Sequence, residues 1–239
     1  MQDIALIIST TLMYSTPLIF TALGGVFSEK SGIVNIGLEG MMVMGAFAGA
    51  AAGYFLGNPW LAFIIGGLAG GLFALIHAIA TVSFNADHTI SGVAINLLAP
   101  GVALFVSKMM FDGATMTPTI PMENKIPRPL NGLFPSGSVL DTIFNSYATV
   151  YLAFILVLVV WYVLYKAKFG LRVTAVGEHP GAADTLGISV TRVRYAAVII
   201  SGILAGLGGA SMSLAVVSSF RPTLISGQGY IAMAAVIFS

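Results

Sequence analysis

The sequence predicts an all-α protein, a polytopic bundle of transmembrane helices, on three observations. Of the 239 residues, 57% are hydrophobic and 8% are charged, whereas a soluble domain carries about a quarter charged residues. Several intervals without a charged residue reach the roughly 20 residues that a helix needs to cross a bilayer. The strict apolar–polar alternation that is typical of outer-membrane barrel strands is missing.

The charge-free intervals predict about seven spans in a single membrane domain over residues 1–239. In chain order the spans cover 4–26, 38–57, 60–82, 89–108, 146–165, 195–218 and 229–239. The turn Gly57-Asn58-Pro59 separates the second span from the third. Because Asp3 stands where a signal peptide carries positive charge, we interpret the first span as retained. The last interval reaches Ser239 without a polar flank, so we expect the bundle to be C-terminally incomplete.

Basic residues predict the orientation of the bundle. The loop 166–194 holds five of the ten Lys and Arg residues, close to both membrane edges. By the positive-inside rule this loop is cytoplasmic, and the loop 109–145 is then extracytoplasmic, as is the N-terminus. The loop 109–145 also contains five prolines, which favour an ordered, extended platform over a flexible linker.

The sequence lacks the features that several classes of function require. The chain has no cysteine, and its net charge of +1 offers no basic footprint for nucleic acid. It has no Gly-x-x-x-x-Gly-Lys-Ser/Thr loop for ATP, no nucleophile motif and no paired carboxylates. His77, Asp87 and His88 do not form a convincing metal set. We therefore expect neither an enzyme nor a cofactor or metal bound by this chain.

The segment FSEKSGIVNIGLEG, residues 27–40, places polar groups and glycines between the first two spans. Asn35 and Glu39 can hydrogen-bond a polar solute, and irregular backbone in a membrane is tolerated where it faces protein or water. In the alternative interpretation the segment is a plain cytoplasmic turn, and Glu39 stabilises the first turn of the next helix. Both interpretations remain open.

Three further polar residues are candidates for a solute pathway. Asn96 and Ser91 lie inside the fourth predicted span, where each needs a hydrogen-bond partner on another helix or on a passing solute. We favour the pathway for Asn96, and helix–helix bonding slightly for Ser91. Gln228 begins the last span on the outer side, where contact with solute and a simple interfacial role are equally compatible with the sequence.

The loop 166–194 contains a short helix signal. Pro180 can start a helix that Gly187 ends, with Ala182, Ala183 and Leu186 on one side and Asp184 on a different face. A helix of one or two turns with small side chains is too weak to stand alone in water. It is better explained as an element that docks in a groove of a partner protein.

Four stretches together resemble the permeases of ABC importers, in the group that serves simple sugars, nucleosides and branched-chain amino acids. They are residues 27–47 (FSEKSGIVNIGLEGMMVMGAF), 86–103 (ADHTISGVAINLLAPGVA), 174–210 (which includes GEHPGAADTLGIS) and 227–238 (GQGYIAMAAVIF). The order of these stretches and their amino-acid sequences are closest to those of nucleoside-type permeases. The chain departs from the pattern in one respect, since such permeases continue for several helices after the last motif.

The resemblance implies a subunit of a bacterial or archaeal inner membrane that imports nucleosides or related small solutes. It implies separate ATPase subunits that use ATP, a second permease subunit (identical or paralogous) and an extracytoplasmic solute-binding protein as partners. It also assigns coupling to the ATPase to Pro180, Ala182, Ala183, Asp184, Leu186 and Gly187.

Two rival functions are weighed against this one. An ion-coupled secondary carrier needs an intramembrane carboxylate, and Glu39, at the edge of a predicted span, is the candidate. An intramembrane enzyme needs an acid pair, a histidine-rich set or a nucleophile motif within the spans, and the sequence has none.

Overall fold

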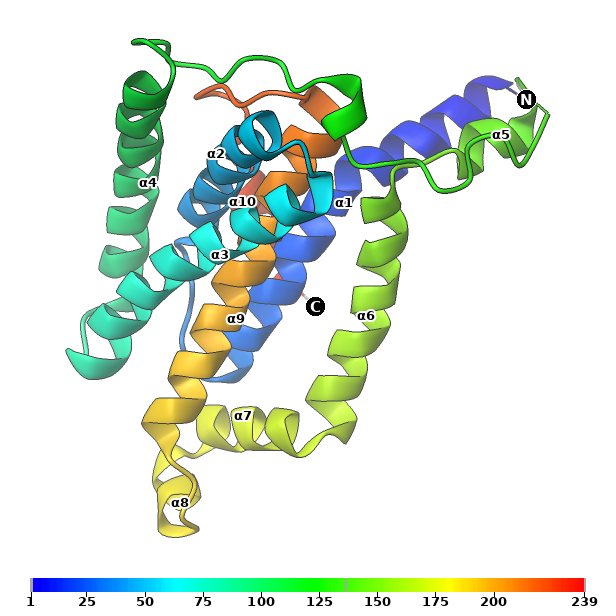
Figure 1. The fold of residues 1–239 in the computed structure, drawn as a ribbon. Helices are drawn as coiled ribbons and strands as arrows, with labels where there is room; N and C mark the ends of the chain where they lie inside the picture. Colours follow the sequence, from blue (N-terminus) through cyan, green and yellow to red (C-terminus); the bar gives the residue numbers. More distant parts are fainter. Residues whose placement is uncertain (1, 136, 239) are drawn as a thin grey trace.

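The computed structural model describes residues 2–135 and 137–238, and the regular elements in this part of the chain are helical (Figure 1). The α-helices are α1 (Gln2–Lys30), α2 (Leu38–Leu56), α3 (Pro59–Ala78), α4 (His88–Met110), α5 (Val139–Phe144), α6 (Ala148–Lys166), α7 (Lys168–Glu178), α8 (Pro180–Thr185), α9 (Val190–Ser211) and α10 (Gln228–Ile237). Two π-helical turns, Ile79–Ser83 and Met212–Val217, extend α3 and α9, and a 3-10 turn covers Met122–Asn124. The predicted all-α class is confirmed.

In the part of the chain that the structure describes, six helices are long and apolar enough to cross a membrane: α1, α2, α3 with its π-helical turn, α4, α6 and α9 with its π-helical turn. The sequence predicts about seven spans, the last over 229–239. In the structure this region is α10, whose ten described residues rise about 15 Å, half of a 30 Å hydrocarbon core. α10 also begins deep in the bundle, beside the first turn of α2, rather than at a membrane edge.

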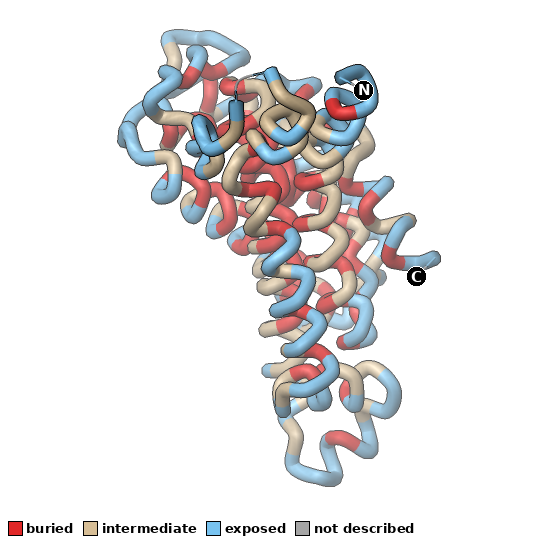
Figure 2. The backbone as a smooth tube through the Cα atoms, turned by 90° about the vertical axis from the view of Figure 1, so that its right-hand side faces the viewer, coloured by how far each residue is buried: buried red, intermediate tan, exposed pale blue. Residues whose placement is uncertain are grey.

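Helices α2, α3 and α9 form the centre of the bundle, with α4 and α6 on opposite sides of it (Figure 1). α2 and α9 are mostly buried, whereas only 28% of the apolar window in each of α1, α4 and α6 is buried, and Figure 2 shows the buried positions concentrated in the central part. The central helices pack backbone against backbone. A Cβ atom added at Gly70 would lie 2.3 Å from the carbonyl oxygen of Gly202, and one at Gly209 would lie 1.9 Å from that of Met42.

Helix α1 changes direction along its length (Figure 1). Pro17 lies inside it and cannot donate a backbone hydrogen bond to the preceding turn, which is a common cause of such a bend. The hydroxyl of Thr21 donates to the carbonyl of Pro17 at 2.9 Å, and the hydroxyl of Thr16 donates to that of Leu12 at 2.7 Å. These buried threonines satisfy carbonyl groups near the bend.

One end of the bundle is covered by the chain between α4 and α6. The sequence predicts an extended platform without helices over 109–145, but α4 continues to Met110, and α5 and the 3-10 turn lie within the segment. The backbone N–H of Thr117 donates to Phe220, and that of Ile120 donates to Ser218, at 3.1 and 2.8 Å. These bonds fix the segment across the turn that follows α9, and Ile120 is buried there.

The opposite end carries α7 and α8. The sequence predicts a loop over 166–194 with one short helix, whereas the structure also contains the eleven-residue α7, and α9 begins at Val190 instead of 195. One face of α7, with Gly170, Val173 and Val176, is buried against the bundle. α8 lies beyond α7 and projects farthest from the bundle (Figure 1).

Candidate functional site

The chain between α1 and α2, residues 31–37, is irregular but fixed by hydrogen bonds. Gly32 has a φ of +82°, a conformation that favours glycine, and lets the chain turn back after α1. The hydroxyl of Ser28 donates to the carbonyl of Ile33 at 2.6 Å, and Nε of Arg194 donates to the carbonyl of Ser31 at 3.3 Å. The turn is therefore held by α9 as well as by the end of α1.

Asn96 joins this irregular segment to two helices. Its Oδ1 accepts from the backbone N–H of Gly40 at 2.8 Å, and its Nδ2 donates to the carbonyl of Ile36 and to the hydroxyl of Tyr230, both at 2.9 Å. Asn96 lies eight residues beyond His88, the first residue of α4, which is about 12 Å along the helix. The start of α2 is therefore well inside the bundle.

Glu39 binds the start of α10. Its Oε1 accepts from the backbone N–H of Gly227, and its Oε2 accepts from that of Gly229, each at 2.6 Å. A carboxylate is stabilised there because the first N–H groups of a helix lack partners and carry partial positive charge. Gly229 permits the approach, since a Cβ atom on it would lie 2.5 Å from the backbone nitrogen of Glu39. The sequence places Glu39 at a span edge, and the structure corrects this to a position in the interior.

Asn35 is almost fully buried, with 4% of its surface exposed. Its Nδ2 donates to the hydroxyl of Ser201 on α9 at 3.0 Å and lies 3.4 Å from the sulfur of Met41. Its Oδ1 has no hydrogen-bond partner among the residues that the structure describes. Asn35 therefore ties the irregular segment to α9 and retains one free acceptor.

Ser91 lies apart from these contacts, and Gln228 lies at their edge. The hydroxyl of Ser91 pairs with Nδ1 of the fully buried His77 at 2.8 Å, so Ser91 joins α4 to α3. Gln228 is the first residue of α10, between the two glycines bonded to Glu39, and is half-buried.

Next to α4, the carboxylate of Asp87 accepts from the N–H of Ile90 at 2.9 Å, and this bond holds the pKa of Asp87 below its usual value.

The contacts define a polar junction that comprises Asn35, Glu39, Asn96, Ser201 and Tyr230. The sequence identifies the first three residues, and the structure brings them together at the place where α2 and α10 both begin. Ser201 and Tyr230 are not singled out by the sequence analysis. Tyr230 stands next to Gly229 in the motif GQGY, which is a usable signal, whereas Ser201 lies in an apolar helix without a local signal.

The structure supports the short helix at Pro180 and corrects one of its faces. α8 begins at Pro180, and Gly187 follows it with a φ of +79°. Ala183 is 3% exposed, because it faces the rest of this chain instead of a partner. Of the residues that the sequence assigns to coupling, Ala182, Asp184 and Leu186 have exposed side chains, the last of them 81% exposed.

Interrupted helices that meet at polar groups within a membrane bundle are an arrangement of transport proteins. The chain is a multi-pass membrane protein of this kind. Residues 7–239 match the family described as "Branched-chain amino acid transport system / permease component", and the chain belongs to that family. It is the permease subunit of an ABC importer in a plasma membrane.

Relatives with named solutes are similar over nearly the whole chain. The guanosine ABC transporter permease protein NupQ of Bacillus subtilis is 48% identical over 99% of this chain and 76% of its own length. The nucleoside ABC transporter permease protein NupC of Lactococcus lactis is 42% identical over 99% of this chain and 76% of its own. The putative glucose ABC transporter permease protein TsgC13 of Haloferax volcanii is 38% identical over 98% and 70%, respectively. No solved structure matches the chain.

Proposed function

We propose that this permease carries nucleosides across the membrane and that its polar junction is the part of the chain that meets or gates the solute. The observation that carries the proposal is the convergence of Asn35, Glu39 and Asn96 where two helices begin inside the bundle. Such interruptions lie beside solute routes in transporters. The names of the two relatives at 48% and 42% identity support nucleosides as the solute class.

The charge of the junction favours an uncharged solute. In many transporters the positive end of an interrupted helix receives an anionic group of the solute. In this chain the carboxylate of Glu39 already occupies the start of α10. A solute carboxylate at the same place would meet like charge, whereas the hydroxyls and ring nitrogens of a nucleoside can bond to amide and hydroxyl groups. Nucleosides and sugars therefore fit better than branched-chain amino acids.

The power source and the partners belong to the same proposal. Separate ATPase subunits hydrolyse ATP, and their movement is transmitted through the exposed residues Ala182 and Asp184 of α8 and Leu186, which directly follows it. The α7–α8 end then faces the cytoplasm, in agreement with its basic residues. A second permease subunit completes the pathway, and a solute-binding protein delivers the solute to the opposite end.

Uptake of radiolabelled nucleosides tests the solute. Cells that lack their own nucleoside uptake receive the complete transporter, and uptake of guanosine and adenosine is measured with ribose, glucose and leucine as competitors. We expect nucleosides to compete with one another and leucine to have no effect. Competition by glucose and ribose, with no competition between the two nucleosides, would assign the permease to sugars.

The depth of Glu39 gives the ion-coupled carrier one supporting observation, because a carrier needs an intramembrane carboxylate. Both oxygens of this carboxylate are bonded to backbone N–H groups, however, which favours a structural role at the start of α10 over a carrier role. Vesicles that contain the permease without its ATPase subunits separate the two functions. Uptake that persists there under an ion gradient would establish the carrier, whereas ABC import requires ATP and the ATPase.

A further inference from the structure

Three cations gather at the corner between α6 and α7. Lys166 ends α6, Lys168 begins α7, and Arg172 follows one turn later. All three side chains are exposed. No acidic residue occurs in the sequence between Asp141 and Glu178. This corner, the α6–α7 corner, is therefore a concentration of positive charge without local acidic neighbours in the chain.

The α6–α7 corner lies at the edge of the membrane. One stripe of α6 is exposed along its length, at positions spaced as one helical face: Phe154, Ile155, Leu158, Trp161, Tyr162 and Tyr165. Such a stripe faces lipid, and its Trp and Tyr residues are of the kind that mark the headgroup level. Nζ of Lys166 lies 6.0 Å from the centre of the Trp161 ring, so the first cation lies at that level.

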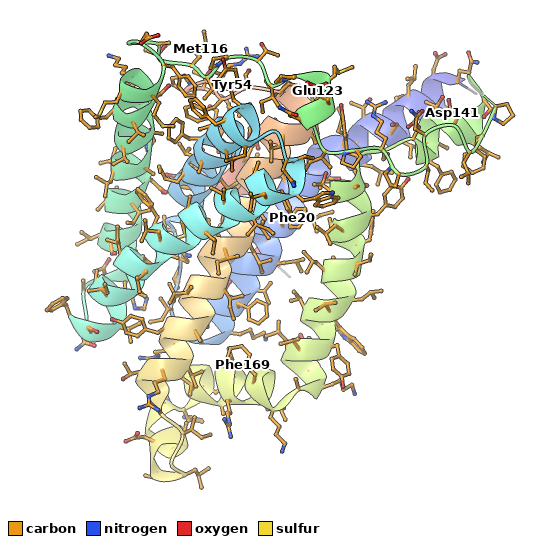
Figure 3. All side chains as sticks on the ribbon, in the orientation of Figure 1. Phe20, Tyr54, Met116, Glu123, Asp141 and Phe169 are labelled. Atoms are coloured by element: carbon orange, nitrogen blue, oxygen red, sulfur yellow. The ribbon has the colours of Figure 1, made fainter. Side chains whose placement is uncertain are left out.

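Helix α7 has the pattern of an interfacial helix. It runs across the end of the bundle between α6 and α9 (Figure 1), and Phe169 points toward the bundle, 6.5 Å from the ring of Phe27 (Figure 3). Its opposite face exposes Lys168, Leu171 and Arg172 at the end next to α6, an apolar side chain between two cations, and Glu178 at the far end. A cation in the first turn does not stabilise a helix, so local stability does not explain Lys168.

We propose that the α6–α7 corner binds the headgroup phosphate of an anionic phospholipid from the adjoining leaflet, with the acyl chains along the exposed stripe of α6. The three cations are opposite in sign to the headgroup phosphate, and the aromatic and aliphatic stripe suits the acyl chains. The ATPase is a less suitable occupant, because α8 projects beyond α7 and offers the more distant contact surface (Figure 1).

The two tryptophans of the chain allow a direct test. Trp161 lies at the corner, whereas Trp60 begins α3 at the opposite end, so the variant Trp60→Phe reports from the corner alone. This variant is reconstituted in nanodiscs of phosphatidylglycerol and phosphatidylcholine, with bromine on the chains of one lipid or the other. One cation that engages an anionic lipid contributes about 1 kcal/mol, which corresponds to about a five-fold enrichment of that lipid at the corner. We therefore expect brominated phosphatidylglycerol to quench Trp161 more strongly than brominated phosphatidylcholine, by the amount that a local enrichment of about five-fold produces. Equal quenching by the two lipids would overturn the proposal.

The controls separate lipid binding from other causes. A triple variant should lose the preference for phosphatidylglycerol; it combines Lys166→Gln, Lys168→Gln and Arg172→Gln. High salt should also abolish the preference when the three cations are unchanged, because salt screens exposed charges. The matched control Lys125→Gln and Arg128→Gln, in the segment at the other end, should retain it. If the triple variant keeps the lipid preference, the corner is not a lipid site. The same holds if Trp60→Phe without the triple substitution shows no preference and the triple variant releases the ATPase.

Discussion

At the scale of single residues, the carboxylate of Glu39 shows how a charge becomes tolerable inside a membrane bundle. It accepts two backbone hydrogen bonds at 2.6 Å from the start of α10. Hydrogen bonds to an ionised group are stronger than neutral ones, and the helix start adds a favourable field. The neutral amide of Glu39→Gln keeps the shape but not the charge.

We therefore expect Glu39→Gln to weaken the hold on α10 by about 2 kcal/mol and to lower nucleoside uptake at least ten-fold. A glutamine amide can accept one of the two N–H bonds but opposes the other with its own N–H₂ group. Uptake is measured beside copurification of the ATPase, which should be unchanged. Glu29→Gln, at the exposed end of α1, is the matched control and should transport normally.

Asn96 offers a test that does not depend on transport. Asn96→Ala removes three hydrogen bonds and leaves the carbonyl of Ile36 and the N–H of Gly40 without this partner. We expect a loss of about 2–3 kcal/mol of stability, measured as a lower thermal midpoint in detergent. Leu97→Ala changes the next residue of α4, which is 75% exposed. An equal loss in that variant would mean that the bonds of Asn96 contribute nothing specific.

At the scale of elements, the two faces of α8 predict different effects. Leu186 is exposed and Ala183 is buried against this chain. Leu186→Glu should release the ATPase, because a charge replaces an apolar contact, while the permease stays folded. Ala183→Glu should destabilise the permease itself by several kcal/mol, since its charge would be buried without a partner. Copurification of the ATPase and the thermal midpoint of the permease distinguish the two. Wild-type yield of ATPase with Leu186→Glu would exclude α8 from coupling.

The crossing of α3 and α9 predicts where side chains cannot be added. A Cβ atom at Gly70 meets the backbone of Gly202 at 2.3 Å, whereas one at Gly101 meets nothing within 4 Å. We expect Gly70→Ala to force the helices apart and cost about 2 kcal/mol or more. Gly101→Ala should be neutral or slightly stabilising, because alanine favours a helix. Thermal midpoints of the two variants check the pair, and similar values would contradict the close crossing.

The sequence predicts helices well where lipid dictates them and less well where the protein covers its own ends. The apolar stretch that ends at Gly57-Asn58-Pro59 marks α2 almost to the residue, over 38–57 against Leu38–Leu56. α7 is missed because Lys168 and Arg172 read as loop charges, and its apolar face becomes visible only against the bundle. The sequence likewise does not predict the partner of Glu39, because Gly229 is 190 residues away and bonds through its backbone.

At the scale of the whole molecule, the orientation in the membrane is a prediction that the cysteine-free chain makes easy to test. Single cysteines are introduced at the two ends and treated with an impermeant thiol reagent in intact cells. Ser136, a natural choice in the segment between α4 and α6, lies outside the described residues, so Leu133, 68% exposed, replaces it. Leu133→Cys should react and Thr185→Cys should not. The reverse pattern would invert the topology.

The bonds between Glu39 and the start of α10 also set an order of events during synthesis. A nascent chain that has not reached residue 227 contains α2 and its carboxylate but neither of the N–H groups that bind it. A carboxylate in a membrane segment is costly as long as it lacks hydrogen-bond partners. Glu39 therefore acquires its two backbone partners only after α9 has left the ribosome, which makes this contact one of the last parts of the region to form.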